Sequence, residues 1–171
     1  QNQWPPKNQQ TLNELVLWRG YWDIEWFAKN FFPHYCNKPF SRMHHELFDL
    51  IQDGCQQRGL KRIIAAPRGH AKTTLMLVIQ VIHAICYEYE PFVVVIAQST
   101  REAQARVSNI LDELRTNERI IEVFGHLAPI GGLGGKNAFI TRNGVSVKAF
   151  SSGQSIRGTQ AKNNRPSLII M

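Results

Sequence analysis

The chain has 171 residues, of which 43% are hydrophobic and 19% charged, and this balance excludes a disordered or collagen-like protein. It carries 20 Lys and Arg against 13 Asp and Glu, and the net charge of +7 suits a polyanionic partner such as nucleic acid, although many soluble proteins are mildly basic. No apolar run reaches the roughly 18 residues of a transmembrane helix, so we expect no membrane partner. Cys36, Cys55 and Cys86 lie far apart without a C-x-x-C spacing and are expected to be reduced thiols of an intracellular protein.

The first 38 residues are predicted to form a polar arm and an aromatic helix that packs on the core. Residues 1–10 are polar and contain proline, and a single helix rich in Trp, Tyr and Phe is predicted up to about Phe32. Its apolar residues cover more than one face, which favours packing within the protein. A partner-binding or membrane-surface helix is the alternative, and Asp23 and Glu25 disfavour an anionic lipid surface.

A second helix is predicted at about 42–58, because Ser41 can cap its start and a glycine follows its end. His44 and His45 lie in its first turn. Adjacent residues of a helix point about 100° apart, so these two histidines are not expected to share a metal ion.

The stretch RIIAAPRGHAKTT, residues 62–74, has the layout of a phosphate-binding loop (P-loop). The segment 61–67, with an apolar run at 63–66, is predicted to be a core strand buried on both faces, a turn at 67–70 follows, and a helix is predicted at about 72–87. In such loops backbone N–H groups surround phosphate oxygens, the Lys neutralises the β- and γ-phosphates, and the Thr hydroxyl binds Mg²⁺. The alternative is an ordinary strand–turn–helix junction with a solvated lysine.

Both glycines of the usual G-x-x-x-x-G-K-[ST] pattern are replaced. Ala66 and Ala71 stand at their positions, and Gly69 is the glycine that remains inside the loop. Glycine serves there because the backbone must approach phosphate closely and often needs a positive φ. Since alanine is the smallest substitute, the sequence predicts a nucleotide site with an altered loop.

The second half of the chain alternates strands and helices. A buried strand is predicted at 92–97, a helix from Ser99 to about Arg115, a hairpin with a type I′ Asn-Gly turn at 139–149, and a buried strand at 167–171. The arginines along the helix are expected to form a solvated face more readily than a DNA contact. Strands that alternate with helices predict a parallel α/β sheet, in which ligands bind beyond the carboxyl ends of the strands.

Four segments in this order resemble the ATPase domain of the large terminase subunit of tailed bacteriophages. They are PFSRMHHELF at 39–48, APRGHAKTT at 66–74, VVVIAQSTREAQARVSNIL at 93–111 and SIRGTQAKNNRPSLII at 155–170. The resemblance covers residues 39–171. It implies a P-loop NTPase of the additional-strand (RecA-like) type, with a parallel-sheet core, flanking helices and a β-hairpin insertion.

The resemblance also implies roles for individual residues. Lys72 resembles the phosphate-binding lysine, Thr73 the Mg²⁺ ligand and Arg68 the loop arginine that contacts the γ-phosphate. Arg157 is the candidate arginine finger that acts on the ATP of a neighbouring subunit, and a contact within its own subunit is an equal alternative. The other expected nucleotide contacts are Pro67, Gly69, His70, Ala71, Thr74, Arg42 and His44.

The activity implied is ATP hydrolysis with Mg²⁺ that drives double-stranded DNA into a viral procapsid. The family implies a homo-oligomeric ring, usually a pentamer, that works with the portal protein and the small terminase subunit in the host cytoplasm. Its two acidic residues would follow the strand that ends at Met171, and a DNA-cutting nuclease domain would lie downstream. Two alternatives stay open: a helicase-like P-loop ATPase, and a DNA-binding or assembly module with a degenerate loop.

Overall fold

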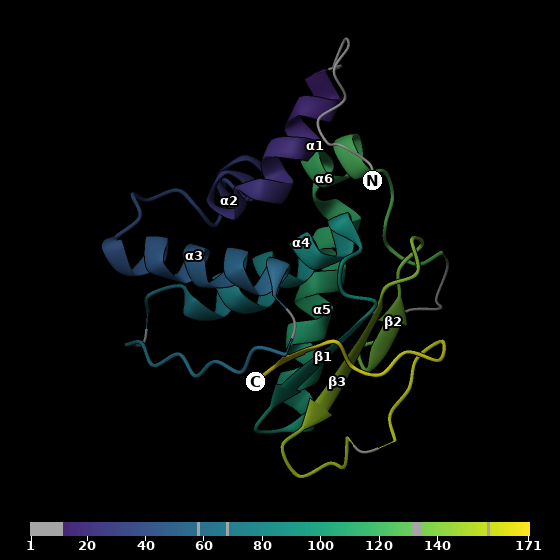
Figure 1. The fold of residues 1–171 in the computed structure, drawn as a ribbon. Helices are drawn as coiled ribbons and strands as arrows, with labels where there is room; N and C mark the ends of the chain where they lie inside the picture. Colours follow the sequence, from purple (N-terminus) through teal and green to yellow (C-terminus); the bar gives the residue numbers. More distant parts are fainter. Residues whose placement is uncertain (1–11, 58, 68, 131–134, 157) are drawn as a thin grey trace. The chain divides into compact units, whose positions relative to one another are not determined.

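The protein is a mixed α/β protein with a four-stranded, mostly parallel sheet and flanking helices (Figure 1). Contacts within the chain divide it into two compact units, residues 1–72 and 73–171. The sheet belongs to the second unit, and the described part of the first unit is helical. The structure is a computed structural model, which describes residues 12–57, 59–67, 69–130, 135–156 and 158–171.

Helices build the described part of the first unit, and the second and third of them have buried apolar faces. They are α1 (Leu12–Trp22), α2 (Ile24–Phe31) and α3 (Arg42–Gln56). Helix α2 packs on α1 and on α3. Phe27 and the neighbouring Phe32 are fully buried, as is Ile51 of α3 to within 1%. Burying each such side chain stabilises the fold by about 1.5–3 kcal/mol.

Asp23 divides the predicted single helix into α1 and α2. Its carboxylate accepts a hydrogen bond from the N–H of Trp26 at 2.8 Å, which is the contact of a helix N-cap. The side chain of Gln52 in α3 forms hydrogen bonds with two more backbone groups at the break. Its Oε1 accepts from the N–H of Ile24 at 3.1 Å, and its amide donates to the carbonyl of Tyr21 at 3.2 Å. The prediction of one continuous helix is wrong because the backbone groups released at the break have these partners.

Residues 61–67, all of them described, form no strand, so the prediction of a first core strand is wrong. The side chain of Ile63 is fully exposed at 101%. A strand needs a neighbouring strand to complete its backbone hydrogen bonds, and this segment has none among the described strands. Arg62 instead ties the segment to α3, because its guanidinium donates to the carbonyl of Leu50 and lies 3.4 Å from the carboxylate of Asp53.

The sheet of the second unit has the strand order β2-β3-β1-β4. Strand β1 (Phe92–Ala97) is parallel to β3 (Ser146–Ser151) on one side and to β4 (Leu168–Ile170) on the other, while β2 (Ala138–Ile140) is antiparallel to β3. All residues of β1 are buried, which confirms the prediction from its unbroken β-branched run. The predicted last strand also forms, but as an edge strand it is partly exposed, with Ile169 at 49%.

Strand β1 packs against side chains of β3, against residues near the C-terminal end of the chain and against helix α5. Phe92, Val94 and Ile96 form a buried cluster with Phe150 of β3, and the partly buried Ile156 and Ala161 pack against that cluster. Helix α5 packs on β1 and β3. In the ladder, Val94 is paired with Lys148 of β3 and with Ile169 of β4.

The helices of the second unit follow the predicted order. They are the π-helix η1 (Thr74–Ile79), α4 (Gln80–Tyr87), α5 (Thr100–Thr116) and α6 (Glu118–Phe124). Ser99 caps α5, because its hydroxyl accepts from the N–H of Glu102 at 3.2 Å. Asn117 ends α5 and caps α6 by accepting from the N–H of Ile120 at 3.2 Å. Among the described helices, none combines the length and the apolar character that crossing a bilayer requires.

Strands β2 and β3 form the predicted hairpin, but it belongs to the main sheet, because β3 pairs directly with β1. Its turn is also different from the predicted type I′, which needs a positive φ at both central residues. Gly144 has φ +97°, whereas Asn143 has no positive φ. The side chain of Asn143 donates to the carbonyl of Ile85 at 2.7 Å, and this long-range bond, which sequence reasoning does not see, holds the turn in place.

Candidate functional site

The two ends of the predicted phosphate loop touch each other. The Nζ of Lys72 donates a hydrogen bond to the carbonyl oxygen of Ala66 at 2.8 Å. Lys72 is half-buried, whereas Gly69 and His70 between the two ends are exposed. An ammonium group is therefore held beside exposed loop backbone, which is the charge that binding a phosphate requires.

Two residues of this loop have left-handed backbone. Gly69 has φ +82° and Ala71 has φ +49°, while His70 between them does not have a positive φ. Backbone that alternates in handedness turns successive N–H groups toward one side and forms a concavity suited to anions. Ala71 therefore takes the conformation that the missing glycine of the usual pattern would take, at a cost of about 1 kcal/mol or more for its Cβ.

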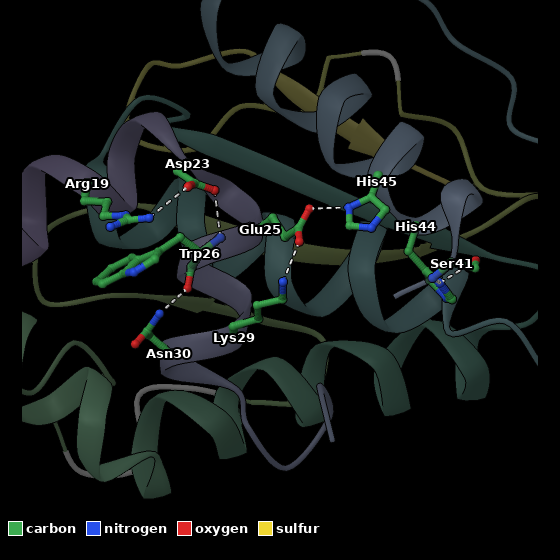
Figure 2. Close-up of polar contacts among 9 residues, drawn as sticks. All are labelled: Arg19, Asp23, Glu25, Trp26, Lys29, Asn30, Ser41, His44 and His45. Atoms are coloured by element: carbon green, nitrogen blue, oxygen red, sulfur yellow. Dashed lines mark hydrogen bonds and ion pairs between the residues drawn. The ribbon is translucent and has the colours of Figure 1, made fainter. Parts of the chain in front are cut away.

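His44 connects the start of α3 to the loop. Its Nδ1 accepts from the N–H of Ser41 at 3.0 Å and lies 2.8 Å from the Ser41 hydroxyl, a contact drawn in Figure 2. Since Nδ1 accepts, Nε2 carries the proton, and it donates to the carbonyl oxygen of His70 at 3.2 Å. The histidine takes the place that Glu or Gln usually has in a capping box, so the capping of α3 also fixes a contact to the loop.

The adjacent His45 has a different partner. Its Nδ1 lies 2.6 Å from one carboxylate oxygen of Glu25, and Lys29 donates to the other oxygen at 2.6 Å (Figure 2). Lys29 also lies 5.0 Å from the ring centroid of Phe40. Desolvation raises the pKa of Glu25, but hydrogen bonds and charge from Lys29 and His45 outweigh it, so the pKa is lowered overall. This cluster joins α2 to α3, and the i,i+4 spacing of Glu25 and Lys29 is the only part of it that is visible in the sequence.

Among the other described residues of the predicted site, Arg42, Pro67 and Thr73 are exposed. Arg42 is 93% exposed and its Nε donates to Glu46 at 2.9 Å. Thr73 is exposed and Thr74 is the first residue of η1, both in the second unit. A π-helical turn is rare and often occurs at functional sites. Pro67 lies exposed within the loop.

Cys36, Cys55 and Cys86 are free thiols. Burial raises the pKa of Cys36 to about 11, against a smaller lowering by Lys29, and burial also raises the pKa of Cys86. A thiol must ionise to act as a nucleophile, so both side chains are inert at neutral pH.

Arg68 and Arg157, the two arginines assigned to phosphate chemistry, lie outside the described residues. The candidate site in the structure therefore consists of the loop backbone, Lys72 and the contact from His44. No protein-family model, curated protein or solved structure matches the chain.

Proposed function

We propose that the loop from Ala66 to Thr73 binds ATP with Mg²⁺, and that the chain is the ATPase core of a motor that drives double-stranded DNA into a viral procapsid. The observation that carries the proposal is the backbone of Ala71. A non-glycine residue adopts a left-handed conformation at the position where the phosphate-loop pattern has glycine. A loop shape that binds anions would account for this conformation at Ala71, while Glu88, Lys162 and Asn163 adopt left-handed backbone elsewhere in the chain.

The residues present fit an ATP phosphate chain. Lys72 supplies a positive charge at the loop, and the backbone around Gly69 and Ala71 supplies N–H donors. Thr73, which follows in the sequence, supplies a hydroxyl of the kind that binds Mg²⁺ in such loops. In this proposal the nucleotide brings its Mg²⁺, and the chain binds and orients the phosphates.

The experiment titrates the 171-residue chain with ATP and Mg²⁺. Calorimetry measures the binding, and a separate thermal unfolding experiment measures the change in melting temperature. ATP should raise the melting temperature of the native chain, because a ligand that binds the folded state stabilises it. Lys72→Ala should lose the shift. Lys61→Ala is the matched control, since Lys61 is an exposed lysine just before the loop, and its variant should keep the shift.

The proposal fails if ATP causes no stabilisation, or if Lys72→Ala and the native chain respond equally. Calorimetry separates a nucleotide site from general charge effects, because it measures stoichiometry directly. Replacing ATP by AMP, which lacks the β- and γ-phosphates, should remove most of the affinity if the loop holds those groups.

The assembled motor would be a ring of identical subunits, usually a pentamer, docked on the portal protein, with the small terminase subunit as a further partner. In that ring Arg157 would reach the ATP of a neighbouring subunit and stabilise charge on the transferring phosphoryl group. Mixing Arg157→Ala subunits with Lys72→Ala subunits tests this role. Mixed rings should regain ATPase activity that neither variant has, and the absence of any gain in assembled mixed rings would argue against a trans role.

A second candidate function is a DNA-binding or assembly module with a degenerate loop. The observation that favours it is the segment at 61–67, which forms no strand although every one of its residues is described, and whose Ile63 is fully exposed. A P-loop normally follows a core strand. DNA binding without any nucleotide response, measured on the same chain, would support this candidate over the ATPase.

A further inference from the structure

An open groove of about 580 Å³ runs along one face of α5 in the second unit. Its walls are α5 and the short segment Gly135–Lys136. Arg101 lies near the start of α5 and Arg115 near its end. At 1.5 Å of rise per residue these two positions are about 21 Å apart along the helix axis.

The groove is strongly cationic. Arg101, Arg115 and Lys136 line it and are all exposed, against a single lining carboxylate, that of Asp112. Within the described parts of the chain these three cations form no ion pair with any carboxylate. Their positive charge is therefore available to a ligand.

Arg106, a third arginine of α5, forms its contacts within the protein. It pairs with Glu102 one turn earlier and donates to the carbonyl of Ile96 at 3.3 Å. Arg106 does not line the groove. The arginines of α5 thus fall into a paired class that supports the fold and an unpaired class that faces the groove.

Half of the remaining lining residues carry neutral hydrogen-bonding groups, and the other half, Ala105, Leu111 and Gly135, do not. Gln104, Ser108 and Asn109 lie on the same face of α5. The amide of Gln104 also donates to the side chain of Asn137, next to Lys136, and this bond ties the second wall to the helix. The apolar side chains of the lining are Ala105 and the buried Leu111, and none of the lining side chains is an aromatic anchor of the kind that protein interfaces favour.

We propose that this groove binds the sugar–phosphate backbone of double-stranded DNA. Guanidinium groups bind phosphate oxygens well, and neutral amides and hydroxyls supply the further contacts that position a backbone without reading its sequence. Along the duplex axis the phosphates of one strand rise by about 3.4 Å each, so the span from Arg101 to Arg115 equals the axial rise of about six of them. The choice of a duplex rests on the proposed motor function, whereas the choice of a phosphate backbone rests on the groove.

The test measures binding of a labelled duplex to the 171-residue chain by fluorescence anisotropy over a range of salt concentrations. The slope of log K against log salt counts the phosphates neutralised. Arg101→Gln, Arg115→Gln and Lys136→Gln should each weaken binding and reduce the slope by about 0.9 per lost contact. Asp112→Asn, which removes the one carboxylate, should tighten binding.

Arg165→Gln is the matched control, because Arg165 is an exposed arginine of the second unit outside the groove, and its variant should keep the native affinity and slope. The thermal unfolding of every variant should match that of the native chain, since all the changed side chains are exposed. Equal slopes for the groove variants and the native chain would overturn the proposal.

Two further binding experiments, with single-stranded DNA and with poly-glutamate, identify the ligand. Preferential binding of single-stranded DNA of the same sequence would overturn the choice of a duplex, and equally tight, groove-dependent binding of poly-glutamate would point instead to an acidic protein segment. Lys72→Ala separates this inference from the ATP site, because that variant should keep full DNA binding. If ATP titration fails while the groove variants lose DNA binding, the proposed ATPase is wrong and the groove stands.

Discussion

The Nε2 of His44 lies 3.2 Å from the carbonyl oxygen of His70, and this hydrogen bond joins the N-terminus of α3 to the loop that contains Lys72. The ring is held at its other nitrogen by the N–H of Ser41 at 3.0 Å. One side chain therefore caps a helix and fixes the loop backbone. Removing it should loosen the loop while the body of α3, which is anchored by its buried apolar face, stays in place.

Replacing His44 by alanine should make the loop amides exchange hydrogen faster. The loss of one hydrogen bond of about 1 kcal/mol lowers the cost of local opening and raises exchange about fivefold. Hydrogen exchange with mass spectrometry of the loop peptide measures this. His45→Ala is the control, because His45 lies on the same helix but contacts Glu25. Equal exchange in both variants would show that the contact to His70 contributes nothing.

Ala71→Gly should stabilise the protein. Alanine at φ +49° costs about 1–2 kcal/mol relative to right-handed backbone, and the added freedom of glycine in the unfolded chain returns about 0.5–1 kcal/mol of that gain. The net increase in the free energy of unfolding is therefore between about 0 and 1.5 kcal/mol, measured by urea denaturation. Ala65→Gly, at a nearby exposed residue without a positive φ, should instead destabilise by about 0.4–1 kcal/mol. Destabilisation by both changes would mean that Ala71 is not strained.

Short apolar runs predict burial but not the partner that burial requires. Strands are predicted at 61–67 and at 92–97, yet only the second forms, and β3 and β4 pair with its two edges. The break at Asp23 escapes prediction for a related reason. It is stabilised by Gln52, whose partners lie 28 and 31 residues away, and no local pattern reveals such contacts.

The position of the phosphate loop follows from the sequence more readily than the contacts around the loop. Its glycine, alanine and lysine positions follow from a local motif, and the left-handed backbone falls at Gly69 and Ala71. The contact from His44 spans 26 residues, and the sequence indicated that residue only through the family resemblance. Arg42, indicated in the same way, extends into solvent, and the nucleotide roles of both residues stay predictions.

Gln52→Ala should destabilise the first unit, because it removes the two hydrogen bonds that Gln52 makes at the break between α1 and α2. Backbone groups left without a hydrogen-bond partner lower the free energy of unfolding by about 1–3 kcal/mol, which urea denaturation measures. Gln56→Ala is the control, since Gln56 is an exposed residue of the same helix, and its effect should stay within about 0.5 kcal/mol. Equal small effects of the two changes would mean that the break needs no support from α3.

Glu25 should make the stability of the protein depend on pH in the acid range. Its pKa is lowered in the folded protein, because the contacts with Lys29 and His45 outweigh the desolvation that raises it. The unfolded chain then binds the proton more readily than the folded one. The stabilisation is therefore fully present above the unfolded pKa of about 4.3, and it is lost as the pH falls through the lower folded value.

Glu25→Gln tests this directly. At neutral pH the variant should be less stable than the native chain by about 1 kcal/mol, because the ionised carboxylate and its two partners are lost. The two free energies of unfolding should converge as the pH falls through the lowered pKa of the folded Glu25 carboxyl, where the native side chain becomes protonated too. Glu46→Gln is the control, since Glu46 pairs with Arg42 at an exposed site, where such pairs contribute little. A difference between Glu25→Gln and the native chain that stays constant over this pH range would show that the side chain acts through packing and not through its charge.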